Sequence, residues 1–208
     1  MNNEAKLDRA RDAGFNLINR LLSGKTGCAE GMRRFLAWAD GKPGGSWRRL
    51  QRVDWSPDLA PSAAWFTDEL RRRTPPPDLR GLWFSVPEIE LNPADLEWCG
   101  CPAFDAKDEE LAWTHEPLRS GPYPDTPVAY RLRALDAART LIGFAGGYNE
   151  RAAARESLVV YLLPLAYTSL LMREILASLP ASIWGTKAGP KGAVAGFAGG
   201  DWVRIPTP

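Results

Sequence analysis

Histidine is almost absent from this sequence, because His115 is the only one among 208 residues. Any mechanism that depends on two histidines is therefore excluded. As a general base, His115 would need a nucleophile and an orienting partner nearby, and no serine lies in a G-x-S-x-G turn that would supply one. We expect a partly exposed histidine at the end of a strand, without a catalytic role.

Cysteine is scarce as well, with Cys28, Cys99 and Cys101 as the full set. A small, odd number indicates a reduced compartment more than a disulfide framework. In a strand, Cys99 and Cys101 would point the same way, so a bridge or a shared metal ion is one interpretation. Zinc sites usually place about two to four residues between paired cysteines and add a second pair of ligands, which this sequence lacks. We therefore expect packed, metal-free thiols and no cofactor.

A hydrophobic run long enough to cross a bilayer is missing. The most apolar stretch, 158–172, reads LVVYLLPLAYTSLLM and has charged residues on both sides. A spanning helix needs roughly 20 apolar residues, so this stretch predicts a buried helix and no membrane segment. We expect one long helix over 149–179, bent at Pro164 and surrounded by other elements.

The first residues are polar and charged and lack the apolar segment of a signal peptide, which favours a cytoplasmic protein. Net charge is also nearly absent, at +1, so no overall field attracts nucleic acid or a membrane. The charge is distributed unevenly, however. Residues 81–120 contain two Lys or Arg against nine Asp or Glu, which makes the middle of the chain strongly acidic.

Apolar residues at helical spacing predict further helices around the apolar run. One is expected over 4–22 and another over 28–39. Ser62 is a candidate cap for a third helix, which the prolines that follow it end. Thr126 is a candidate cap for a fourth helix, because Pro127 comes next and suits the first helical position.

Alternating apolar residues predict strands over 82–86, 97–104 and 111–114. A hairpin is expected near the C-terminal end, about the glycine pair that includes Gly199. Proline cannot donate to a strand ladder, so Pro87 predicts an edge strand or a broken strand for the first of these segments.

Together these elements predict an α+β fold, with helices packed around a long central helix and against a small, mainly antiparallel sheet. The length of the chain suits a single domain over 1–208. A helical subregion over 1–74 is the alternative organisation, because the run of prolines after it would separate it from the rest.

Seven acidic side chains of the middle region are the candidate partner-binding residues: Glu88, Glu90, Asp105, Asp108, Glu109, Glu110 and Glu116. A surface of one charge attracts a partner of the opposite charge and speeds its capture. Because no persuasive catalytic motif is present, we expect a non-catalytic bacterial protein that binds a basic protein partner. A toxin-neutralising immunity protein is the specific form of this hypothesis. A solvated surface that protects a sheet edge is the plain alternative for the same charges.

Two other functions stay open. Glu88 and Glu90 share one face of an extended segment and would serve as a hydrolytic pair, or hold a divalent ion, if a cleft set their separation. The N-terminal third mixes arginine with tryptophan, as grooves for single-stranded nucleic acid do, but aspartates interrupt its charge, so nucleic acid is the less favoured partner. The residues of this mixture are Arg33, Arg34, Arg48, Arg49, Arg52, Arg71, Arg72, Arg73, Trp38, Trp47, Trp55 and Trp65.

Overall fold

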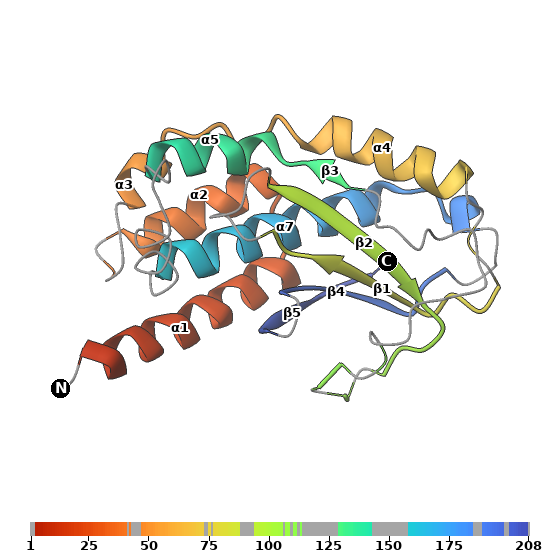
Figure 1. Ribbon diagram of the computed structural model, residues 1–208, viewed down its shortest axis with the longest axis horizontal. Coiled ribbons are helices and arrows are strands. Elements are labelled where there is room, and N and C mark those ends of the chain that lie inside the picture. Colours follow the sequence, from red (N-terminus) through yellow and green to blue (C-terminus); the bar gives the residue numbers. More distant parts are fainter. Residues whose placement is uncertain are drawn as a thin grey trace.

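The computed structural model shows an α+β fold in which helices pack against a five-stranded sheet (Figure 1). The predicted fold class is therefore confirmed, while the single domain over 1–208 stays a prediction. The structure describes residues 3–40, 42, 47–72, 75, 77–87, 94–105, 107, 108, 110, 111, 113, 129–142, 158–184, 189–197 and 200–207.

The two N-terminal helices are where apolar spacing predicts them. Helix α1 spans Asn3–Ser23 and helix α2 spans Cys28–Ala39, and each buries one face. A short helix, α3 at Trp47–Leu50, follows. Helix α4 spans Leu59–Arg72, so it begins before Ser62, which lies inside it and is buried. The predicted cap at Ser62 is therefore wrong.

Helix α7 spans Leu158–Ser178, within the predicted range of 149–179, whose first nine residues lie outside the described chain. Its side chains from 162 to 172 are all buried. It packs against α1, α2, α4 and two strands of the sheet. Gly31 of α2 permits this close approach, because a Cβ atom there would lie 2.9 Å from Leu170 Cδ1. No helix within the described residues is long and apolar enough to cross a membrane.

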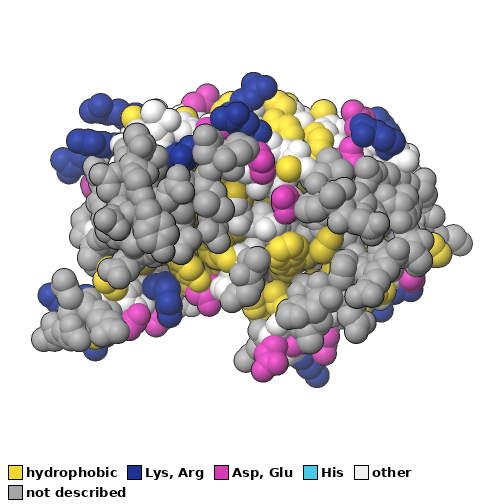
Figure 2. All heavy atoms as spheres, viewed as in Figure 1, with side chains coloured by type: hydrophobic (Ala, Val, Ile, Leu, Met, Phe, Trp, Pro, Cys, Tyr) yellow, Lys and Arg dark blue, Asp and Glu magenta, His cyan; other side chains and the backbone are white. Residues whose placement is uncertain are grey.

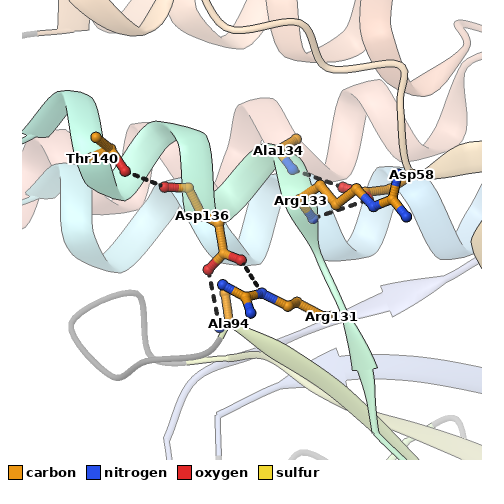
Figure 3. A network of polar contacts seen from close by, with 7 residues as sticks. All are labelled: Asp58, Ala94, Arg131, Arg133, Ala134, Asp136 and Thr140. Atoms are coloured by element: carbon orange, nitrogen blue, oxygen red, sulfur yellow. Dashed lines mark hydrogen bonds and ion pairs between the residues drawn. The ribbon is translucent and has the colours of Figure 1, made fainter.

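Helix α5 spans Arg133–Ile142 and begins later than predicted. Thr126 and Pro127 lie outside the described residues, and Tyr130–Arg131 form strand β3, so no helix runs through from that cap. The start of α5 is held instead by Asp58, from the loop before α4. Its carboxylate accepts hydrogen bonds from the backbone N–H groups of Arg133 at 3.0 Å and Ala134 at 2.9 Å (Figure 3).

Asp58 also joins α5 to α7, since the Tyr167 hydroxyl of α7 donates a hydrogen bond to Asp58 Oδ2 at 2.8 Å. A second carboxylate, Asp136 on α5, forms an ion pair with Arg131 and accepts a hydrogen bond from the backbone N–H of Ala94 at 3.4 Å (Figure 3). Ala94 immediately precedes strand β2. The carboxylates of Asp58 and Asp136 therefore link α7, α5 and the start of β2.

The sheet has the strand order β3-β2-β1-β4-β5. Strand β1 is Gly81–Ser85, β2 is Asp95–Cys101, β4 is Gly192–Gly196 and β5 is Trp202–Ile205. Strands β1 and β4 run parallel, and the other neighbours are antiparallel. The predicted hairpin near the C-terminal end is confirmed as the pair β4 and β5.

Two strand predictions are wrong. Strand β1 lies in the middle of the sheet and not at its edge. The strand ends before Pro87, and the hydrogen bond between β1 and β4 nearest to that proline runs from the Val86 N–H to the Gly196 carbonyl at 2.8 Å. The proline thus lies beyond the ladder and costs no hydrogen bond. In the predicted strand over 111–114, Leu111 has a φ of 53°, which extended backbone does not adopt.

One face of the sheet packs against the helices. Phe66 of α4 lies with its ring centroid 5.7 Å from that of Phe84 on β1 and 4.9 Å from that of Trp98 on β2. Helix α7 contacts β4 and β5. The buried side chains of this face are Leu82, Phe84, Leu96, Trp98, Ala193, Ala195, Val203 and Ile205.

Shortening a buried leucine of α7 tests its burial. We expect Leu162→Ala and Leu170→Ala each to lower the free energy of unfolding by about 2–5 kcal/mol, because each leaves a cavity that the neighbours fill only in part. Leu141 of α5 is 38% exposed and is the matched control, with a loss below about 1 kcal/mol. Urea denaturation followed by circular dichroism measures all three. Parent-like midpoints for both α7 variants would contradict the burial.

Removing the carboxylate of Asp58 tests the link between the helices. Asp58→Ala leaves two N–H groups and the Tyr167 hydroxyl without their acceptor, so we expect a loss of about 2–4 kcal/mol in unfolding free energy. Asp54 is the control from the same loop, because it is exposed and, among the described residues, its side chain bonds only to Ser56. Equal chemical denaturation curves for Asp58→Ala and Asp54→Ala would refute the role given to Asp58.

Candidate functional site

The second face of the sheet is lined by side chains that alternate with those packed on the helices. The register places Cys99, Trp83, Val194 and Arg204 in one row across four strands. The next row is Glu97, Ser85, Gly196 and Trp202. Successive side chains of a strand point to opposite sides, so both rows face away from α7.

The segment after β2 folds back over one end of this second face. The ring of Phe104 lies on the backbone at Gly192, where a Cβ atom would be 2.1 Å from Phe104 Cζ. Trp113 lies in the same way on Gly81, where a Cβ atom would be 2.4 Å from Trp113 Cζ3. The two rings are 5.1 Å apart in an edge-to-face arrangement. Trp113 belongs to a second apolar cluster with Cys101, Leu111 and Val194, and Phe104 packs against this cluster.

The remainder of the second face is half-buried, and we call it the open face. It consists of Trp83, Ser85, Glu97, Cys99, Trp202 and Arg204. The Arg204 guanidinium carbon lies 5.5 Å from the centre of the Trp202 ring, which is cation–π distance. Figure 2 shows hydrophobic side chains where Figure 1 has the middle of the sheet, with acidic side chains close by. The open face therefore combines aromatic surface with charges of both signs.

A groove between α1 and β5 adjoins the open face. It has a volume of about 710 Å³ and is lined by Arg11, Asp12, Phe15, Asn16, Asp201 and Trp202. Beside it, the Tyr161 hydroxyl donates to Asp201 Oδ2 at 2.5 Å, and burial together with this bond raises the pKa of Tyr161. Trp202 belongs to both the groove and the open face, so the two form a continuous surface around the edge strand.

Three of the predicted acidic residues are described, and they lie between the two anchoring rings in the chain. Asp105 and Glu110 are exposed and Asp108 is half-buried. Asp105 Oδ1 accepts a hydrogen bond from the Lys107 N–H at 2.8 Å, and Asp108 Oδ1 accepts one from the Glu110 N–H at 3.0 Å. These bonds shape the local turns. We call Asp105, Asp108 and Glu110 the acidic segment.

The other predicted site residues are not described. Glu88, Glu90, Glu109 and Glu116 lie outside the described residues, as does His115. The carboxylate pair of the hydrolase hypothesis therefore stays a prediction. Sequence reasoning did not single out Trp83 and Trp202, because their common face follows from the strand register, which local alternation alone does not reveal.

Two of the four tryptophans in the arginine and tryptophan mixture of the N-terminal third are not available for stacking. Trp47 and Trp55 are buried in the core and offer no exposed ring to a nucleobase. Arg33 and Arg34 both pair with Glu30, at 2.6 and 2.8 Å. These pairs reduce the positive charge available on α2 for phosphate groups.

The two nearby thiols lie on the second face of the sheet. The Sγ atoms of Cys99 and Cys101 are 3.9 Å apart, with Cys99 half-buried and Cys101 buried. The hydrogen-bond contact between the two thiols lowers the pKa of Cys99, and the same contact, with burial, raises the pKa of Cys101. Within the described ranges, no three metal-ligating side chains come together.

Comparison with family models, with curated proteins and with solved structures gives no match. The function proposed for this chain is therefore drawn from the open face, the groove and the acidic segment themselves.

Substitutions at the Gly192 contact test how the segment after β2 is held. Gly192→Ala places a methyl group inside the ring of Phe104, so we expect it to cost about 1–3 kcal/mol of unfolding free energy. Phe104→Ala alone also destabilises, because it removes a ring that packs against the second apolar cluster and Trp113. The Gly192→Ala/Phe104→Ala double variant should lose less unfolding free energy than the two single variants lose together, since the new methyl group then fills the space that the ring has left. Strictly additive losses in urea denaturation would show that the ring does not lie on Gly192.

Proposed function

We propose that this chain is a non-catalytic protein that binds a basic protein partner through the open face and the acidic segment beside it. The observation that carries this proposal is a sheet face with two half-buried tryptophans, Trp83 and Trp202, one end of which is covered by Phe104 and Trp113, the rings that flank the acidic segment in the chain. Aromatic anchors ringed by charge are the composition of protein interfaces.

The acidic segment supports a partner of positive charge. Asp105 and Glu110 extend into solvent, and the surrounding region 81–120 contains nine acidic residues against two basic ones. Exposed charges of one sign raise the rate of encounter with a partner of the opposite sign. Glu97 extends the negative charge onto the open face itself.

The tryptophans support a partner that is a folded protein. Trp83 is on the central strand and faces away from the helices, with Cys99 and Val194 as cross-strand neighbours. A tryptophan held by its sheet neighbours loses little conformational freedom on binding, which is why this residue type dominates many interfaces. The half-buried ring of Trp202 extends the same surface toward the groove.

A toxin-neutralising role is the narrower form of the proposal. An inhibitor of a cationic toxin needs fast capture and a slowly dissociating contact, and acidic steering with aromatic anchors supplies both. The assay for this form is protection of growth when the captured partner is produced alone or together with this chain. Normal growth with the partner alone would reject the toxin while leaving the binding proposal intact.

Neutralising the acidic segment is the test of charge steering. The variant Asp105→Asn/Asp108→Asn/Glu110→Gln retains side-chain acceptors for the local turns, so the fold should persist. We expect a lower association rate for a basic partner captured from the native host, with a difference that shrinks as salt rises, because screening acts over roughly 8 Å at physiological ionic strength.

A control variant that removes the same number of negative charges elsewhere separates the effect of the acidic segment from the effect of net charge. Asp8, Asp54 and Asp68 are exposed and lie outside the sheet, so their Asp→Asn triple variant should keep parent-like association. The measurement is surface-based binding kinetics at several salt concentrations. Equal association rates for the parent and both triple variants at low salt would contradict docking through the acidic segment.

Shortening Trp83 is the test of the aromatic anchor. Trp83→Ala should raise the dissociation rate by about tenfold or more, since hot-spot tryptophans contribute about 2 kcal/mol or more, and high salt should not remove the effect. Trp38→Ala is the matched control, because Trp38 is also half-buried but lies on α2. A parent-like dissociation rate for a folded Trp83→Ala variant would remove the open face from the proposal.

A further inference from the structure

The Cys99 and Cys101 thiols are placed as a reactive pair. They occupy alternate positions of β2, on the same face, and their Sγ atoms are 3.9 Å apart. Alternate residues of a strand have Cα atoms about 6.6–6.8 Å apart, which is the upper end of the span that a disulfide bridges. Side-chain rotation leaves the Cβ atoms in place, so closure also requires the backbone at Gly100, between the two cysteines, to bend until the Cβ atoms are about 3.5–4.5 Å apart.

We propose that Cys99 and Cys101 form a redox-active dithiol that closes to an intrastrand disulfide by exchange with a small disulfide such as oxidised glutathione. The argument for this dithiol does not depend on the partner-binding proposal, although Cys99 belongs to the open face. It adds a covalent modification to the second face of the sheet and uses no metal ion.

The two sulfur atoms have different roles. Cys99 is half-buried and reachable from solvent, whereas Cys101 is 0% exposed and lies in the cluster with Leu111 and Trp113. The thiolate is the attacking form, and the contact with the Cys101 thiol favours it at Cys99, where the pKa is lowered. Cys99 is thus the attacking thiol and Cys101 the resolving thiol.

The exchange proceeds in two steps. The Cys99 thiol first gives its proton to solvent, and its thiolate attacks one sulfur of the glutathione disulfide, which releases one glutathione thiolate and leaves a mixed disulfide on Cys99. Cys101 then loses its proton and attacks Cys99 Sγ, which breaks the mixed disulfide and releases the second glutathione. The protein dithiol is oxidised by two electrons, and one glutathione disulfide is reduced to two thiols.

Cys28 supplies an internal comparison. It is 2% exposed on α2, and burial raises the pKa of its thiol well above the ordinary value. No second cysteine sulfur lies near it among the described residues. In the folded protein Cys28 should therefore stay reduced under conditions that oxidise the pair on β2.

The experiment uses the purified full chain in glutathione buffers that range from fully reduced to strongly oxidised. After acid quenching, free thiols are alkylated in denaturant and the peptides are mapped by mass spectrometry. We expect Cys99 and Cys101 to lose alkylation together, with a loss of two hydrogen atoms in one peptide, and Cys28 to stay alkylated. Dithiothreitol should restore both thiols.

Two serine variants resolve the order of the steps. In Cys101→Ser the second step is blocked, so Cys99 should accumulate bound glutathione. In Cys99→Ser the remaining thiol is buried, so it should stay unmodified for at least tenfold longer. Circular dichroism shows whether each variant is folded. If a variant does not fold, the peptide map of the parent protein alone tests whether the disulfide forms.

Three results would overturn the proposal. The first is retention of both thiols by the parent protein at every glutathione ratio. The second is glutathione bound to Cys99 or Cys101 of the parent without closure of the pair. The third is a disulfide that links two chains through Cys99 in place of the intrastrand bond.

Discussion

Burial of α7 is the constraint on which the rest of the structure depends. Its side chains are mostly apolar on all sides and are all buried from 162 to 172, so neighbours must surround it. Helices α1, α2 and α4 provide part of that cover, and strands β4 and β5 provide another part. The sheet therefore commits one face to α7 and α4. Its second face points the other way, and the open face is a consequence of how the core is enclosed.

Two carboxylates transmit this arrangement to the sheet. A buried carboxylate is unfavourable without partners, and Asp58 finds them in two N–H groups at the start of α5 and in the Tyr167 hydroxyl of α7. The positive end of the α5 dipole adds to this stabilisation. Asp136, one turn along α5, then binds Arg131 and the backbone just before β2. Strand β2, which contributes Glu97 and Cys99 to the open face, is thus held in position relative to α7 by contacts that run through α5.

Local sequence predicts those elements whose signals are local. Helices α1 and α2 follow from apolar spacing, because each buries one face along its own length, and the β4–β5 hairpin follows from its glycines. The start of α5 could not be predicted in this way, since its cap, Asp58, lies 75 residues before Arg133. The central place of β1 depends on parallel pairing with β4, more than 100 residues later in the chain. No alternation within one segment encodes such a pairing.

In the candidate site, too, some residues could be predicted from local sequence and others could not. Acidic residues stand out by composition, so Asp105, Asp108 and Glu110 could be identified without a structure. The aromatic half of the surface depends on register, because Trp83 and Trp202 share a face only through the intervening strand β4. The roles proposed for Cys99 and Cys101 likewise depend on which of the two is buried, and the sequence shows only that one residue separates the two cysteines.

The covering of Gly192 and Gly81 connects the two halves of the surface. Phe104 and Trp113 can lie directly on the sheet because glycine leaves the backbone bare at both places. The acidic segment lies between these two rings in the chain, so each of its ends is held close to the sheet. A segment held in this way has less conformational freedom to lose when a partner docks. Fixed ends therefore favour tight binding by a short charged segment, which a free acidic tail of the same composition would not achieve.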